Sequence, residues 1–387
     1  MLNYISADWI FPVTSSPIKN GIVVVHPDGT IADILPADAA TQQLPGTIQK
    51  LTGAIVPGFV NTHCHLELSH LLGKIPEHTG LMSFVQWIIR NRSGFTADEV
   101  QQAMEQADKA LFDNGTVAVG DISNTDVSRA VKLSSRIKYH TFVEILGFDP
   151  ARANAIWAAG DAVKKAFSPL PATVVPHAPY TVSSTLLQCI ATADEPLISI
   201  HNQETTAENR FYTHGSGGVQ ELYAALGMDI SYFEPTGKSS LQSYLPYMPK
   251  KKTLLVHNTF TDKDDIIFAN QQQQELFWCL CPNANIYIEN TLPDVQMLLE
   301  SGVNITLGTD SLASNHQLNI LAEMKTLQHH KKVDFETLLR WATWNGAEFL
   351  GMTDQLGSIT PGKKPGLNLI SLGKGHQITT GKVTRLI

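Results

Sequence analysis

A short apolar run in the sequence ends in two histidines: Val56-Pro57-Gly58-Phe59-Val60-Asn61-Thr62-His63-Cys64-His65. Its length and apolar character are typical of a buried strand. In a strand, residues i and i+2 point to the same side, so His63 and His65 face one direction and Cys64 faces the other. The run therefore predicts a strand that carries two imidazoles at its carboxyl end, with Cys64 as a packing thiol.

Seven further apolar runs of strand length follow, at residues 116–123, 139–147, 173–180, 197–201, 253–257, 276–282 and 304–310. Stretches with helical periodicity separate them, as at residues 81–92, where apolar residues recur on one face. Strands that alternate with helices imply parallel crossover connections, and eight such units close into a barrel. We therefore expect an α/β fold, a distorted (β/α)8 TIM barrel over residues 56–350.

Both ends of the chain have the signals of β-structure. Residues 22–25 are Ile-Val-Val-Val before the turn at residues 27–29, and the apolar run at residues 367–372 follows Pro365-Gly366. Because chain ends often lie close together, we expect residues 1–55 and 351–387 to form one small β-sandwich domain beside the barrel.

The composition indicates a globular protein. Hydrophobic residues make up 43% of the 387 residues, and charged residues only 17%, which argues against disorder. Because so few residues are charged, we expect much buried surface, in a large core, at a subunit interface or both, and an interface would make the protein a homodimer. The net charge of −8 gives no reason to expect a nucleic-acid partner.

The sequence also bears on localisation. No apolar run approaches the ~18–20 residues that a membrane helix needs, so no membrane association is expected. The first residues lack the basic and apolar regions of a signal peptide. The four cysteines include no CxxC pair, so reduced thiols in a cytoplasm are the simplest interpretation.

Polar residues end several of the other runs. His177, His201 and His257 end the fourth, fifth and sixth runs, and Asp310 ends the eighth. In a parallel barrel these ends surround one mouth. Imidazole and carboxylate are natural ligands of a zinc-like ion, so we expect a mononuclear metal site there. Glu204 lies three residues after His201, where a carboxylate could move protons to and from a metal-activated water.

Four motifs in this order resemble the amidohydrolase superfamily: His63-Cys64-His65, His177-Ala178-Pro179-Tyr180, His201-Asn202-Gln203-Glu204 and Gly308-Thr309-Asp310-Ser311. The chain is similar to the branch of cytosine deaminases, methylthioadenosine/S-adenosylhomocysteine deaminases and chlorohydrolases. The resemblance implies one divalent metal ion per subunit. Zinc is the expected metal, and iron, nickel and manganese are the alternatives. Its implied ligands are His63, His65, His201 and Asp310.

The same resemblance implies the roles of the other site residues. Glu204 would be the acid/base, and His257 would hold the water and polarise the developing charge. Asp310 would also handle protons, and His177 would touch the substrate. Two-metal amidohydrolases typically carry a carboxylated lysine on the fourth strand, and residues 173–180 contain no lysine. The resemblance therefore favours the one-metal branch, in which deamination of aromatic amines dominates.

The sequence is compatible with several substrates. Residues 65–69, 83–87 and 307–315 most resemble aminodeoxyfutalosine deaminases, which act on an adenine-type nucleoside in an alternative menaquinone pathway. Methylthioadenosine, S-adenosylhomocysteine, adenosine or another aromatic amine is the first alternative, and a chlorohydrolase is the second. A catalytically silent binding protein is the alternative of another class.

Further substrate contacts are expected around the barrel mouth. The region of residues 66–115 would overhang it, and Glu67 and Trp87 are candidates within that region. Arg210 and Ser311 are candidates from later loops. Packing for Trp87 and a solvent-exposed position for Arg210 are the competing interpretations.

Overall fold

Two parallel four-stranded sheets form the middle of the chain. The protein is described by a computed structural model that covers residues 1–38, 44, 46–272 and 274–387. One sheet holds β8 (Phe59–Cys64), β9 (Thr116–Ser123), β10 (Lys138–Ile145) and β11 (Ala172–Pro176). The other holds β12 (Leu197–Asn202), β13 (Lys252–His257), β14 (Leu276–Leu280) and β15 (Asn304–Leu307). Every neighbouring pair within the two sheets is parallel.

Backbone hydrogen bonds join the two sheets at both seams. The amide of His201 donates to the carbonyl of His177 at 2.9 Å, which links the end of β11 to β12. The amides of Thr309 and Asp310 donate to the carbonyl of His63 at 3.0 and 3.1 Å, which links the segment after β15 to β8. The eight described strands therefore form a closed ring, and the predicted TIM barrel is confirmed.

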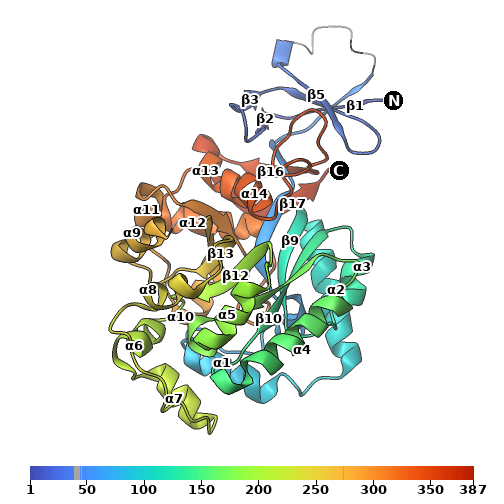
Figure 1. Cartoon of the computed structure of the whole chain (residues 1–387). Coiled ribbons are helices and arrows are strands. Elements are labelled where there is room, and N and C mark those ends of the chain that lie inside the picture. Colours follow the sequence, from blue (N-terminus) through green and yellow to red (C-terminus); the bar gives the residue numbers. More distant parts are fainter. Residues whose placement is uncertain (39–43, 45, 273) are drawn as a thin grey trace.

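Helices follow the strands and surround the barrel (Figure 1). They are α1 (Leu81–Asn91), α2 (Ala97–Asp113), α3 (Arg129–Ser134), α4 (Ala153–Ala166), α5 (Ser184–Thr192), α6 (Thr206–His214), α7 (Gly218–Ala225), α8 (Ser240–Tyr244), α9 (Lys263–Gln271), α10 (Pro282–Glu289), α11 (Val295–Glu300), α12 (Ile320–Lys331), α13 (Phe335–Arg340) and α14 (Gly346–Phe349). Local sequence explains several starts. Before α2, the hydroxyl of Thr96 accepts from the amide of Glu99 and the Glu99 carboxylate accepts from the amide of Thr96, a capping box.

Two sheets at the chain ends stack on each other. The first has the order β5 (Ile31–Leu35), β4 (Ile22–Val25), β1 (Asn3–Ser6), β6 (Ile48–Lys50), and the second β17 (Ile378–Arg385), β16 (Leu367–Leu372), β7 (Ala54–Pro57), β2 (Trp9–Ile10), β3 (Ile18–Lys19). Ile5 and Val23 of the first sheet share one apolar cluster with Ile55 of the second. The predicted β-sandwich is therefore confirmed. The exact domain boundaries, at 55/56 and 350/351, stay a prediction.

The second terminal sheet also covers the barrel. Because side chains alternate along a strand, Ala54 and Val56 on β7 point away from Ile55. They belong to the large core cluster that includes Phe335 and Leu338 of α13. The β-sandwich is thus attached at one end of the barrel, and Figure 1 shows α1, α6 and α7 at the opposite end.

Five predicted strands end earlier than expected: the first, third and seventh by one or two residues, and the fourth and eighth by three or four. The fourth run was predicted to extend to residue 180, but β11 ends at Pro176 and a 3-10 turn at Pro179–Thr181 follows. The eighth run was predicted to extend to Asp310, but β15 ends at Leu307. His177 and Asp310 therefore lie just beyond their strands, still at the carboxyl end of the barrel.

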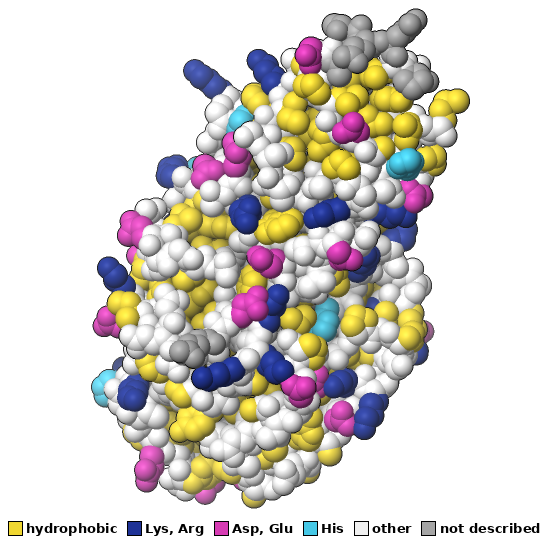
Figure 2. Space-filling view, turned by 45° about the horizontal axis from the view of Figure 1, so that its top comes forward, with side chains coloured by type: hydrophobic (Ala, Val, Ile, Leu, Met, Phe, Trp, Pro, Cys, Tyr) yellow, Lys and Arg dark blue, Asp and Glu magenta, His cyan; other side chains and the backbone are white. Residues whose placement is uncertain are grey.

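The surface view shows how charged and hydrophobic side chains are distributed. On the face shown in Figure 2, Lys and Arg side chains are interspersed with Asp and Glu side chains. Hydrophobic side chains gather at the top of this view, over the terminal sheets. Within the described ranges, no helix combines the length and the apolar character that crossing a membrane requires.

Candidate metal centre and active site

Three predicted ligands converge where β8 ends. The Nε2 atoms of His63 and His65 lie 3.1 Å apart, and Oδ1 of Asp310 lies 3.4 and 3.3 Å from them. All three side chains are buried. The second carboxylate oxygen of Asp310 accepts a hydrogen bond from the hydroxyl of Ser314 at 2.5 Å, which fixes the carboxylate plane.

These distances fit a metal ion. A tetrahedral zinc ion with ligand bonds of ~2.0–2.1 Å holds its donor atoms about 3.3–3.4 Å apart. The three separations of 3.1, 3.3 and 3.4 Å are close to that spacing. The spacing of these atoms and their nitrogen and oxygen chemistry therefore fit a divalent cation.

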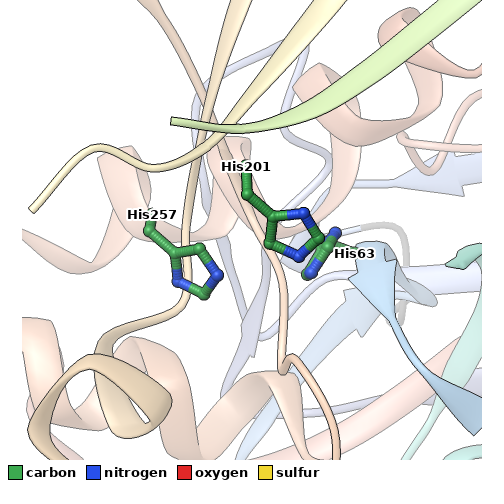
Figure 3. Close-up of side chains that lie close together, drawn as sticks. All are labelled: His63, His201 and His257. Carbon is green, nitrogen blue, oxygen red and sulfur yellow. The ribbon is translucent and has the colours of Figure 1, made fainter. Parts of the chain in front are cut away.

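His201 is oriented by its neighbour in the barrel. Its Nδ1 donates to the carbonyl oxygen of His177 at 2.8 Å, with Oε1 of Glu144 at 3.4 Å. Because Nδ1 carries the proton, the lone pair of Nε2 is free to bind a metal ion, the arrangement usual for a metal-binding histidine. Candidate ligand atoms of His63, His201 and His257 lie within 4.8 Å of one another. Figure 3 shows these three imidazoles gathered from β8, β12 and β13.

Burial keeps the imidazoles neutral. It lowers the pKa of His65 to about 3 and, together with the nearby imidazoles, lowers the pKa of His201 well below its usual value. Burial alone would raise the pKa of Asp310, but the hydrogen bond from His63 and the electrostatic interaction with the nearby imidazoles of His65 and His257 hold it well below its usual value. Neutral imidazoles and an ionised carboxylate are the forms that bind metal.

Glu204 and His257 face each other beside these ligands. Oε1 of Glu204 lies 3.6 Å from Nε2 of His257. Burial first, then the charges of Asp310 and Glu289, raise the pKa of Glu204 well above its usual value. A carboxyl group whose pKa is raised in this way is suited to donate a proton. Nδ1 of His257 lies 2.9 Å from Oδ1 of Asn285, which leaves Nε2 facing the site.

The backbone is strained at this mouth. Gln203, His257 and Asp310 have φ values of 46°, 74° and 57°, in the left-handed region that residues other than glycine seldom adopt. Backbone strain of this kind persists where the surrounding structure imposes it, often at functional sites. Here it occurs where the chain leaves β12, β13 and β15.

The predicted residues open into a cavity of about 170 Å³. Its polar lining includes His65, Glu144, His177, His201, Glu204, His257, Asp310 and Ser311. Apolar residues of α1 line the other side, among them Leu81, Phe84, Val85 and Ile88. The cavity thus combines polar groups that can do chemistry with an apolar wall that can hold a flat ring.

Two of the predicted substrate contacts, His177 and Ser311, line this cavity, and three do not. The carboxylate of Glu67 instead accepts from the amide of Asn124 at 3.0 Å, after β9. Trp87 packs in the apolar cluster around α1, and Arg210 is exposed on α6. Within the described chain, Glu67, Trp87 and Arg210 are not among the residues that line the cavity. A substrate role for them stays a prediction.

Two residues of the site were missed by the sequence analysis. Glu144 lies near the end of β10, so a search for carboxylates at strand ends could have found it. Asn285 lies on α10, and nothing in its local sequence marks it. Only the fold brings its amide to His257.

Comparison with known proteins shows similarity to amidohydrolases, including several nucleoside deaminases. The amidohydrolase family model matches residues 54–384. The aminodeoxyfutalosine deaminase of Nitratiruptor sp. is 27% identical over 337 residues, which cover 83% of this chain and 80% of that protein. The 5-methylthioadenosine/S-adenosylhomocysteine deaminase of Bacillus cereus is 27% identical over 372 residues, covering 89% and 79%. A solved structure of Helicobacter pylori aminofutalosine deaminase in complex with methylthio-coformycin has the same fold, with a TM-score of 0.79, 22% identity and coverage of 98% and 94%.

Proposed function

The chain belongs to the amidohydrolase family, and on this premise we propose that it is a metal-dependent hydrolase that deaminates an adenine-type nucleoside. Members of this family use a divalent metal ion. In the chain, His63, His65, His201 and Asp310 would hold one such ion. Their nitrogen and oxygen donors suit zinc, and iron, nickel or manganese would fit the same set.

The proposal rests on one geometric observation: Glu204 is buried in the cavity lined by His65, His201 and Asp310, with its Oε1 3.6 Å from Nε2 of His257. Ring deamination needs a group that protonates a ring nitrogen while water adds to the neighbouring carbon. A carboxyl group with a raised pKa can do this at neutral pH. A silent binding protein has no need of a buried acid at this place, whereas a chlorohydrolase would use the same acid and differs in its leaving group, chloride instead of ammonia.

The chain's own residues divide the work of the reaction. The net change replaces the ring amine by the oxygen of water and releases ammonia. Glu204 donates its proton to the ring nitrogen, and the free Nε2 of His257 accepts a hydrogen bond from the attacking water. Asp310 takes one proton from that water and returns it to the departing amine, and Glu204 regains a proton from the new ring hydroxyl as the carbonyl forms. When bound, a divalent ion lowers the pKa of water toward ~7.

Aminodeoxyfutalosine is the first proposed substrate, which would place the enzyme in menaquinone biosynthesis. The name of the Nitratiruptor relative and the resemblance of residues 65–69, 83–87 and 307–315 support it. Methylthioadenosine, S-adenosylhomocysteine and adenosine are the alternatives, supported by the Bacillus cereus relative at equal identity. We also propose a cytoplasmic homodimer, on the basis of the reduced cysteines and the low charged fraction.

A substrate screen tests the proposal. Zinc-loaded protein is supplied with aminodeoxyfutalosine, methylthioadenosine, S-adenosylhomocysteine, adenosine and guanine, and ammonia release is measured. We expect the highest kcat/KM with aminodeoxyfutalosine. A higher value with another adenine nucleoside would replace the substrate and keep the reaction. Chloride release from a chlorotriazine without deamination would identify a chlorohydrolase, and the absence of any turnover would favour a binding protein.

A further inference from the structure

The strand that carries the two histidines is not held by a regular ladder. β8 pairs in parallel with β9, but the register shifts between Asn61 and Cys64, which pairs with Asp121. A bulge of this kind interrupts the ladder hydrogen bonds and re-aims side chains. The segment after β15 holds the carbonyl of His63 on one side, and on the β9 side another contact can fix the backbone that carries His65.

A buried carboxylate on the neighbouring strand makes that contact. Oδ1 of Asp121, on β9, accepts a hydrogen bond from the amide of Leu66 at 2.8 Å. Leu66 directly follows His65, so this bond anchors the peptide unit that joins the two residues. Side chains at Asp121 and Lys132 are both 0% exposed, and Oδ2 of Asp121 lies 2.6 Å from Nζ of Lys132.

Lys132 is itself fully engaged. From α3 its ammonium also donates to the hydroxyls of Ser123 and Thr141, both at 3.0 Å. It lies 4.8 Å from the ring centroid of Phe167. A buried ion pair adds little net stability compared with apolar residues of similar volume, because desolvation offsets the attraction. Stability alone therefore does not account for the pair.

We propose that Asp121 is a positioning residue that places His65 for metal binding, and that the ion pair with Lys132 holds its carboxylate in place. The inference rests on the metal site of the proposed function, but not on its substrate. Asp121 acts through the amide of Leu66, at a strand irregularity where the β8–β9 ladder is interrupted. Metal ligands supported in this way typically lose about 10- to 100-fold in affinity when the support is removed.

Zinc titration of the metal-free protein against a chelator of known affinity tests this role. Asp121→Ala removes the acceptor, and we expect its Kd for zinc to rise about 10- to 100-fold. The double variant Asp121→Asn/Lys132→Met removes both charges but keeps an amide oxygen that can accept from Leu66. We expect its Kd to stay within about threefold of the wild type, well below the ~10-fold loss expected without the support.

Glu195→Ala is the matched control. Glu195 is a buried carboxylate paired with Lys164 at 2.5 Å, and it makes no contact with the histidines among the described residues. It should lower the urea midpoint of unfolding without changing the Kd for zinc. The inference is overturned if Asp121→Ala binds zinc as tightly as Glu195→Ala, or if the double variant binds as weakly as Asp121→Ala. Failure of the wild type to bind any metal would instead overturn the metal site, and absent turnover with normal zinc binding would affect only the proposed reaction.

Discussion

The Oδ1 atom of Asn285 lies 2.9 Å from Nδ1 of His257, so a helix residue decides which imidazole nitrogen faces the active site. The amide is itself fixed, because its Nδ2 donates to the hydroxyl of Thr259 at 3.0 Å. Asn285 therefore accepts from His257, and Nε2 of His257 remains an acceptor opposite Glu204. This orientation is what lets His257 hold the water in the proposed reaction.

Asn285→Leu should lower kcat without releasing the metal. The substitution leaves the buried N–H of His257 without an acceptor, a cost of about 1–3 kcal/mol, so kcat should fall about 10- to 100-fold. Asn285→Asp keeps an acceptor oxygen and should lose less. Steady-state kinetics with metal analysis checks both variants. Equal losses in the two variants would show that the hydrogen bond does not set the role of His257.

Glu204→Gln should abolish most of the turnover and leave the fold intact. Glutamine has the same shape but cannot transfer a proton, and general acid–base groups typically contribute about 10²–10⁴-fold. We expect a fall of that size in kcat, with zinc content and unfolding midpoint unchanged. A loss of less than tenfold would assign the proton transfer to another group.

Much of this arrangement could be predicted from the sequence. The strands come from apolar runs between helical stretches, so barrel and strand-end histidines follow from local pattern. Their convergence depends only on all strands being parallel. His63, His65, His201, Glu204 and Asp310 were therefore accessible from spacing and motif order, and the structure brings them together.

Other parts of the site depend on contacts that local sequence does not encode. The partner of His257 is Asn285, 28 residues along the chain, and it arrives from a helix rather than a strand end. Trp87 is a predicted contact that the fold directs away from the cavity. It lies in the predicted overhanging region, but the rotation of α1 turns Phe84 and Ile88 to the cavity and packs Trp87 in the neighbouring apolar cluster. Helix rotation follows from tertiary packing.

His140 should make stability depend on pH in a defined window. Burial first, then the charge of Lys132, lowers its pKa from 6.5 to about 4. The folded state thus holds this imidazole neutral, whereas the unfolded chain takes up a proton as pH falls below 6.5. Its contribution, on the order of 3 kcal/mol, is present above pH 6.5 and is lost as pH falls toward 4.

Urea unfolding from pH 7.5 to 4.0 measures this effect. His140→Gln can keep the hydrogen bond to the hydroxyl of Thr173, which lies 3.1 Å from Nε2 of His140. The variant should lose stability less steeply than the wild type between pH 6.5 and 4. His329→Gln, at an exposed position on α12, is the control and should follow the wild type. Parallel curves for the wild type and His140→Gln would contradict the prediction.

Turnover in ¹⁸O-labelled water is the most direct test of whether the protein deaminates its substrate hydrolytically at a metal site. Zinc-loaded protein is incubated with the best nucleoside of the screen, and the product is analysed by mass spectrometry while ammonia is measured. We expect one ¹⁸O atom in the product base and one ammonia per turnover. The formation of both should stop after chelation and resume when zinc is added. A product without ¹⁸O, or undiminished turnover after verified removal of all metal, would contradict this expectation.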